Sequence, residues 1–173
     1  MNQAVAVEQR TRAAQPAAVA RLIALVLPLA LLAGAYGSQY LGGLQPCEMC
    51  WWQRYAHMGA LAFAILAFVR SDAQWVRWTT LLAALAIALS GGIAVYHAGV
   101  EAKVFEGFTT CTALPTKGLS TAELLKTLTH APLVRCDEVQ FRFLGISMAG
   151  WNAIISLSGA GTILYLLWKA RKA

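Results

Sequence analysis

Four long runs of apolar residues alternate with shorter polar stretches along the chain. Each run has the length of about 20 residues that a helix needs to cross the hydrocarbon core of a bilayer. The first, third and fourth runs contain no Asp, Glu, Lys or Arg, and the second contains only Arg54, near its start. We therefore expect four membrane-spanning helices, at about residues 22–41, 51–69, 78–97 and 146–168.

Composition agrees with a membrane protein. Hydrophobic residues make up 58% of the chain, charged residues only 13%, and the mean hydropathy is +0.57. A soluble domain with this composition would expose apolar surface and aggregate. The predicted fold is an all-α integral membrane protein, a four-helix transmembrane bundle over residues 22–168. Two outer loops, 42–50 and 98–145, and one inner loop, 70–77, connect its spans.

Charge placement predicts the orientation of the bundle. If the N-terminus is cytoplasmic, that side carries eight of the 14 basic residues and two of the eight acidic ones, so the whole net charge of +6 lies there. Basic residues near span ends favour the cytoplasmic side. We expect a cytoplasmic tail at each end, residues 1–21 and 169–173, and periplasmic outer loops. No basic stripe lies outside these flanks, and we expect no nucleic-acid partner.

The N-terminal region permits two interpretations. Basic residues precede the first apolar run, as in a signal peptide, and Ala33–Ala35 is a passable cleavage pattern. However, the run continues beyond Ala35 at nearly full span length, so we expect it to remain as a span. Residues 1–20 show no clear pattern, and we expect a mobile tail there.

All four cysteines fall on the predicted periplasmic side, where thiols become oxidised. Cys47 and Cys50 lie in the first outer loop, and Cys111 and Cys136 lie in the second. Four cysteines allow three pairings, and loop membership favours Cys47 with Cys50 and Cys111 with Cys136. Taken alone, a Cys111–Cys136 bridge fits a structural staple, because it would close a loop of 26 residues and stabilise it by about 3.5 kcal/mol.

The Cys47/Cys50 pair fits redox chemistry better than a staple. A bridge across so short a segment constrains little chain entropy and is easier to reduce. Half of a zinc site is the main alternative, but zinc needs four ligands, and we expect no metal site. The histidines that would have to complete such a site are scattered along the chain at His57, His97 and His130.

Arg54 lies one helical turn after Cys50, on the same face if the helix has begun there. The positive end of the helix macrodipole and this arginine both favour a thiolate. The guanidinium can also donate hydrogen bonds to an oxygen acceptor, although simple snorkelling to the interface is an alternative. The sequence contains no GxGxxG, haem CxxCH or iron–sulfur cysteine motif. A membrane quinone is therefore the natural remaining candidate for the electron acceptor.

Four ordered sequence blocks resemble the bacterial disulfide bond formation protein B (DsbB) family. The resemblance covers the chain from the first span to the fourth, and the tail before Arg21 lies outside it. The blocks are QPCEMCWWQRY at 45–55, AVYHAG at 94–99, VRCDE at 134–138 and FLGISMAGWN at 143–152.

This resemblance implies a thiol:quinone oxidoreductase of the bacterial inner membrane that reoxidises a periplasmic thioredoxin-fold oxidase of the DsbA type. The relay that keeps the periplasm oxidising runs from DsbA through DsbB to quinone. By position, Cys111 forms the mixed disulfide with the partner, and Cys136 is released. Cys136 then attacks Cys47, which frees Cys50.

The resemblance also assigns the cofactor site. Cys50 would face a ubiquinone or menaquinone, and Arg54 would hold its oxygen. His97, at the outer end of the third span, would line this site or handle protons; an interfacial histidine bonded to backbone is the alternative.

Between Cys111 and Cys136, Ser120–Glu123 resembles a capping box and predicts a short surface helix through Leu128.

Other functions remain open from the sequence. One is a specialised DsbB-like paralogue that serves a dedicated partner. Another is a structural four-span protein with permanently stapled outer loops, which would not depend on quinone. A reductase similar to vitamin K epoxide reductase is a third, but that family carries its active CxxC on a late span.

Overall fold

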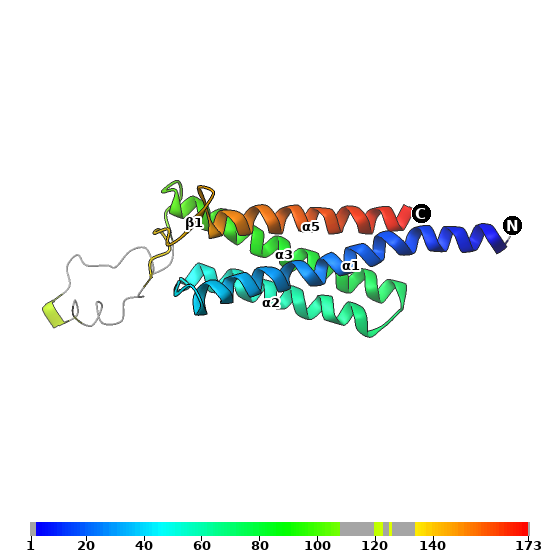
Figure 1. Ribbon diagram of the computed structural model, residues 1–173, viewed down its shortest axis with the longest axis horizontal. Helices are drawn as coiled ribbons and strands as arrows, with labels where there is room; N and C mark the ends of the chain where they lie inside the picture. Colours follow the sequence, from blue (N-terminus) through cyan, green and yellow to red (C-terminus); the bar gives the residue numbers. More distant parts are fainter. Residues whose placement is uncertain (1–2, 108–119, 123–124, 126–133, 173) are drawn as a thin grey trace.

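The computed structural model describes residues 3–107, 120–122, 125 and 134–172, with side chains from residue 15 onward. Long helices lie side by side along most of their length and form an all-helical four-helix bundle, as predicted (Figure 1). In the described part of the chain these helices are α1 (Gln3–Tyr40), α2 (Glu48–Val69), α3 (Ala73–Glu101) and α5 (Met148–Lys172).

Three of the helices are long and apolar enough to cross a membrane: α1 from Gln15, α3 and α5. The fourth helix, α2, packs against α3 and α1 over its 22 residues. Its first three turns carry Gln53, Arg54 and His57, all buried. These three polar side chains and Glu48 lower its hydropathy, whereas the helix is apolar from Gly59 to Val69. The polar turns of α2 therefore lie inside the bundle.

The first helix begins much earlier than the predicted span. Residues expected to form a mobile tail are helical from Gln3 onward, and the start of α1 projects beyond the other helices in Figure 1. Residues 3–20 include seven alanines, three glutamines and two arginines, all good helix formers. Local helix propensity therefore extends α1 in the absence of a clear hydrophobic pattern.

Both chain termini lie at one end of the bundle, together with the α2–α3 connection (Figure 1). Asp72 caps α3 at this end by accepting the backbone N–H of Trp75 over 2.8 Å. The α1–α2 connection and the start of α5 lie at the opposite end (Figure 1), and Cys47 and Cys136 pack together there. The candidate site is therefore at the end of the bundle away from both termini.

Small residues allow the helices to approach closely. Alanines of all four helices fill the centre of the bundle, among them Ala24, Ala60, Ala84 and Ala160. A Cβ atom at Gly91 of α3 would lie 2.9 Å from the Leu157 side chain of α5. The α3–α5 contact thus depends on the absence of a side chain at this position.

A short hairpin leads into α5. Its strands, β1 (Arg142–Phe143) and β2 (Ile146–Ser147), are antiparallel. Leu144 and Gly145 between them both have positive φ, 52° and 81°, as a type I′ turn requires. Ser147 Oγ then accepts the Gly150 N–H over 3.1 Å and caps the new helix. The predicted loop helix at 120–128 lies mostly outside the described residues.

Candidate functional site

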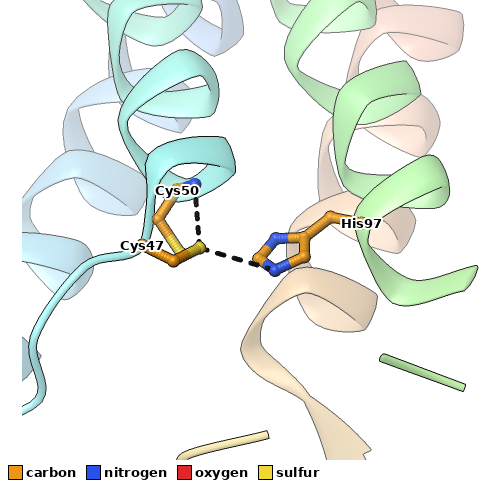
Figure 2. Close-up of side chains that lie close together, drawn as sticks. All are labelled: Cys47, Cys50 and His97. Atoms are coloured by element: carbon orange, nitrogen blue, oxygen red, sulfur yellow. Dashed lines mark hydrogen bonds between the residues drawn. The ribbon is translucent and has the colours of Figure 1, made fainter. Parts of the chain in front are cut away.

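Cys47 and Cys50 lie at the N-terminus of α2, as the sequence predicted (Figure 2). Cys47 is the N-cap residue, and its Sγ accepts the backbone N–H of Cys50 over 3.4 Å. The two sulfur atoms are 3.0 Å apart. A disulfide has an S–S distance of about 2.05 Å, so a small movement of either side chain would suffice to form one.

A third sulfur joins this pair from the second outer loop. Cys136 is fully buried and packs in one apolar cluster with Cys47, Met49 and Val100. The pKa of the Cys47 thiol is raised, first by its hydrogen bond with Cys136, then by that with Cys50 and by burial. Cysteines far apart in the chain are therefore in contact at one point. Cys111, the remaining predicted site cysteine, lies outside the described residues.

The electrostatics distinguish Cys50 from Cys47. The pKa of the Cys50 thiol is lowered, mainly because the Cys47 thiol donates a hydrogen bond to its sulfur. The backbone contact at the helix start and the charge of Arg54 act in the same direction, and burial opposes them. Of the two thiols, Cys50 is therefore the one that loses its proton first.

His97 reaches this pair from α3. Its Nε2 atom lies 3.6 Å from Cys47 Sγ (Figure 2). The same atom lies 3.2 Å from the carbonyl oxygen of Cys136. Its Nδ1 atom lies 3.0 Å from Nε2 of Gln53 on α2. The ring is 3% exposed. His97 therefore contacts a backbone carbonyl, as the alternative of an interfacial histidine predicts, and it also contacts the sulfur of Cys47.

The orientation of the Gln53 amide follows from its other partners. Its Nε2 donates to the backbone carbonyl of Met49 over 3.2 Å, and its Oε1 accepts from Asn152 Nδ2 over 2.7 Å. The atom facing His97 Nδ1 is therefore a donor, so Nδ1 accepts and Nε2 carries the proton. The His97 N–H group points toward Cys47 and the Cys136 carbonyl. The sequence analysis assigned no role to Gln53 or Asn152, although each is a polar residue inside a predicted span and lies in one of the blocks that carry the family resemblance.

A metal ion is the alternative use of this cluster. One ligand atom each from Cys47, Cys50 and His97 lies within 4.8 Å of the others. A histidine that binds zinc through Nε2 carries a proton on Nδ1 and donates it to an acceptor. Here Nδ1 faces an N–H group of Gln53. In a zinc site, the Nδ1–H of His97 and the N–H of Gln53 would therefore point at each other, with no acceptor between them. The hydrogen bonds favour thiol chemistry over zinc binding.

Arg54 is buried between α2 and α1 and does not snorkel to the surface, since only 6% of it is exposed. Its Nη2 donates to the carbonyl oxygen of Ala35 over 2.9 Å, and its Nη1 donates to Oε1 of Gln39. The guanidinium also lies over the rings of Tyr36 and Trp51, at 4.8 and 5.0 Å from their centroids. Its remaining N–H groups are available to a ligand.

A cavity of about 290 Å³ adjoins the sulfur pair. Small and apolar residues of α1 between Ala30 and Ala35 form one part of its lining. Its polar lining residues include Cys50, Arg54, His57, His97 and Asn152. An apolar wall facing a few convergent polar groups is the usual composition of a cofactor site.

Polar contacts hold the Cys136 segment against the rest of the outer end. Arg135 and Lys103 both form ion pairs with Asp137 and hold the pKa of its carboxyl well below the ordinary value, Arg135 contributing most. Gln140 and Gln45 exchange two hydrogen bonds, at 2.7 and 3.2 Å, between the two outer loops. The described segment around Cys136 is thereby anchored beside the first outer loop.

Comparison with known proteins gives one consistent family. Residues 17–166 match the family model of the disulfide bond formation protein DsbB. Disulfide bond formation protein B of Marinobacter nauticus is 32% identical over 132 residues, which are 72% of this chain and 76% of that protein. The protein of the same name from Shewanella sp. (strain MR-4) is 32% identical over 136 residues, 76% of this chain and 75% of that protein. No solved structure matches the chain significantly.

Proposed function

Since this chain belongs to the DsbB family of disulfide bond formation proteins, we propose that it reoxidises a periplasmic DsbA-type oxidase and passes the electrons to a membrane quinone. Family membership makes it a multi-pass membrane thiol oxidoreductase with a role in disulfide bond formation. The partner, the acceptor, the orientation and the roles of individual residues are our proposal.

One observation carries this proposal. Sulfur atoms from both outer loops, those of Cys47, Cys50 and Cys136, meet at the start of α2 beside a cavity that Arg54 also lines. A structural staple needs only two sulfurs in contact. Three sulfurs in contact fit a site where one disulfide is exchanged for another.

The exchange follows from thiol chemistry. The reduced partner attacks the Cys111–Cys136 disulfide at Cys111, and Cys136 leaves as a thiolate. The Cys136 thiolate attacks Sγ of Cys47, so that a Cys136–Cys47 bond forms, the Cys47–Cys50 bond breaks, and Cys50 leaves as a thiolate. A leaving thiol with a low pKa departs faster, and the environment of Cys50 lowers its pKa. The second partner thiol then attacks the mixed disulfide, which releases the oxidised partner and leaves Cys111 as a thiolate. The Cys111 thiolate attacks Cys136, so that the Cys111–Cys136 bond forms again, the Cys136–Cys47 bond breaks, and Cys47 leaves as a thiolate. The pair Cys47 and Cys50 is then fully reduced and holds the two electrons.

The cavity residues suit a quinone headgroup. A bound quinone, ubiquinone or menaquinone, would accept two electrons and two protons. Cys50 presents its thiolate at the cavity, Arg54 offers N–H groups to a quinone oxygen, and the α1 residues exclude water from this side. His97 keeps an N–H group beside Cys47, where it stabilises negative charge on that sulfur.

The proposed orientation places the cysteine end of the bundle in the periplasm. The two termini and the α2–α3 connection share the opposite end (Figure 1), and that end carries the excess of basic residues. The positive-inside rule therefore supports a cytoplasmic location for both termini.

Disulfide mapping tests the exchange step. In a Cys111→Ser variant purified without quinone, we expect peptide mass spectrometry to find a Cys47–Cys136 bond and a free thiol at Cys50. The native protein, mixed with a reduced partner that lacks its second active-site cysteine, should instead be trapped as a mixed disulfide at Cys111, because the partner has no second thiol to resolve the bond. Permanently stapled loops would give neither species: Cys47–Cys50 would remain intact in the Cys111→Ser variant, and the partner would stay unbound in the second experiment.

A further inference from the structure

His57 lies one helical turn deeper in the bundle than Arg54, and the exchange steps above do not use it. It is 3% exposed and lines the same cavity. Its Nε2 atom contacts Asn152 Oδ1 at 3.0 Å and Ser156 Oγ at 3.4 Å. Its Nδ1 atom is buried and has no hydrogen-bond partner among the described residues. A buried polar atom without a partner destabilises the protein, and so calls for a ligand.

The surrounding hydrogen bonds determine which nitrogen of His57 carries the proton. Ser90 uses its hydroxyl hydrogen on the backbone carbonyl of Gln53, so its oxygen accepts from Asn152 Nδ2. Asn152 Nδ2 also donates to Oε1 of Gln53. The Asn152 atom facing His57 is consequently the acceptor Oδ1. His57 Nε2 therefore donates, and a neutral ring then presents Nδ1 as a bare acceptor.

An acceptor at this position suits one redox form of a quinone. A quinone carries carbonyl oxygens, which accept hydrogen bonds but cannot donate them. The quinol carries hydroxyl groups in their place, and each hydroxyl can donate. Arg54 and His57 both line the cavity. Arg54 offers only donors, whereas His57, about 4.5 Å further along the axis of α2, carries the acceptor Nδ1, which is unpartnered within the described structure. The two residues thus differ in what they can bind.

We propose that His57 Nδ1 accepts a hydrogen bond from the quinol hydroxyl remote from Arg54 and so makes the cavity bind quinol in preference to quinone. This inference rests on the proposed function. In the net reaction, the Cys47 and Cys50 thiols lose two electrons and two protons and form their disulfide. The quinone gains both electrons and both protons and becomes the quinol. A contact made only by the quinol favours reduction of the bound cofactor.

Binding measurements test this without turnover. In a Cys50→Ser background, which cannot oxidise the quinol through Cys47–Cys50, we would measure the dissociation constants of decylubiquinone and of its quinol by equilibrium partition in detergent. One hydrogen bond between neutral groups changes affinity about two- to tenfold. His57→Leu should therefore weaken quinol binding by this factor and leave quinone binding unchanged. Ser156→Ala removes a neighbour of Nε2 but not the Nδ1 acceptor, so it should leave the ratio of the two constants as it is.

A second measurement does not depend on whether the His57→Leu variant folds. With ¹⁵N-labelled histidine in the Cys50→Ser protein, addition of the quinol should shift the Nδ1 resonance of His57 and addition of the quinone should not. Equal effects of both ligands, or an unchanged ratio of constants in His57→Leu, would overturn the role of His57 and leave the proposed function intact. Failure of both ligands to bind with His57 present would instead overturn the quinone cavity itself.

Discussion

Gln53 donates an amide N–H to Nδ1 of His97 over 3.0 Å, and this contact aims the opposite nitrogen of the ring at Cys47. A Gln53→Glu substitution would replace the donor by an acceptor and draw the His97 proton onto Nδ1. We expect ¹⁵N spectra to show the proton on Nε2 in the native protein and on Nδ1 in the variant. The variant would then have no N–H group beside Cys47. We expect the exchange of Cys47 with Cys136 to slow about tenfold, which corresponds to an increase of roughly 1.4 kcal/mol in the activation free energy. An unchanged tautomer in Gln53→Glu would contradict the assignment.

The lowered pKa of Cys50 predicts a specific pH dependence. In the reduced protein its alkylation by iodoacetamide should persist below the ordinary thiol value of 9.0, because the thiolate is the reacting form. Cys47→Ala removes the hydrogen bond that lowers the pKa most, so the midpoint of the rate–pH profile should move upward by about one unit or more. Met49→Leu alters packing near the pair without touching this bond and should leave the midpoint in place.

The ion pairs of Asp137 predict acid sensitivity of the second loop. Because the folded protein lowers the pKa of this carboxyl, the ion pairs contribute stability above its ordinary value of 3.8 and lose it as the pH falls further. Asp137→Asn should mimic the acid state at neutral pH and reduce the rate of Cys47–Cys136 bond formation in Cys111→Ser protein. The pairs are partly solvent-exposed, so we expect a change of at most about fivefold.

Glu138→Gln is the matched control for that substitution. Glu138 is 69% exposed and interacts with Arg135 only at 3.5 Å, so this variant should exchange at the native rate. Equal rates for Asp137→Asn and the native protein would show that these ion pairs do not position Cys136.

Neighbouring glycines of α3 offer a paired test of the bundle. A Cβ atom at Gly91 would meet Leu157 at 2.9 Å and Ser156 at 3.2 Å, whereas one at Gly92 would have no neighbour within 4 Å. Gly91→Ala should destabilise the protein by about 1–3 kcal/mol through overpacking. Gly92→Ala should be neutral or stabilising by up to about 1 kcal/mol, because alanine favours helix. Thermal unfolding in detergent would measure both, and equal melting temperatures would contradict the close α3–α5 approach.

The sequence predicted the elements whose signals are local. Apolar runs of spanning length predicted the helices, and the spacing of Cys47, Cys50 and Arg54 predicted their common helix start. It did not predict the convergence of Gln53, His97 and Asn152, because three separate helices supply these residues and only packing determines which of their faces meet. The helical start of α1 was also missed, since a segment without hydrophobic periodicity can still be helical by propensity.

Quinone-dependent oxidation of a partner by the purified protein tests the central claim most directly. We would mix it with a reduced DsbA-type oxidase and decylubiquinone, and follow quinone absorbance together with partner thiols. We expect one quinone to be reduced for each partner disulfide formed, and no reaction in Cys50→Ser. Partner oxidation that proceeds equally without quinone, or full activity in Cys50→Ser, would contradict the proposed electron path.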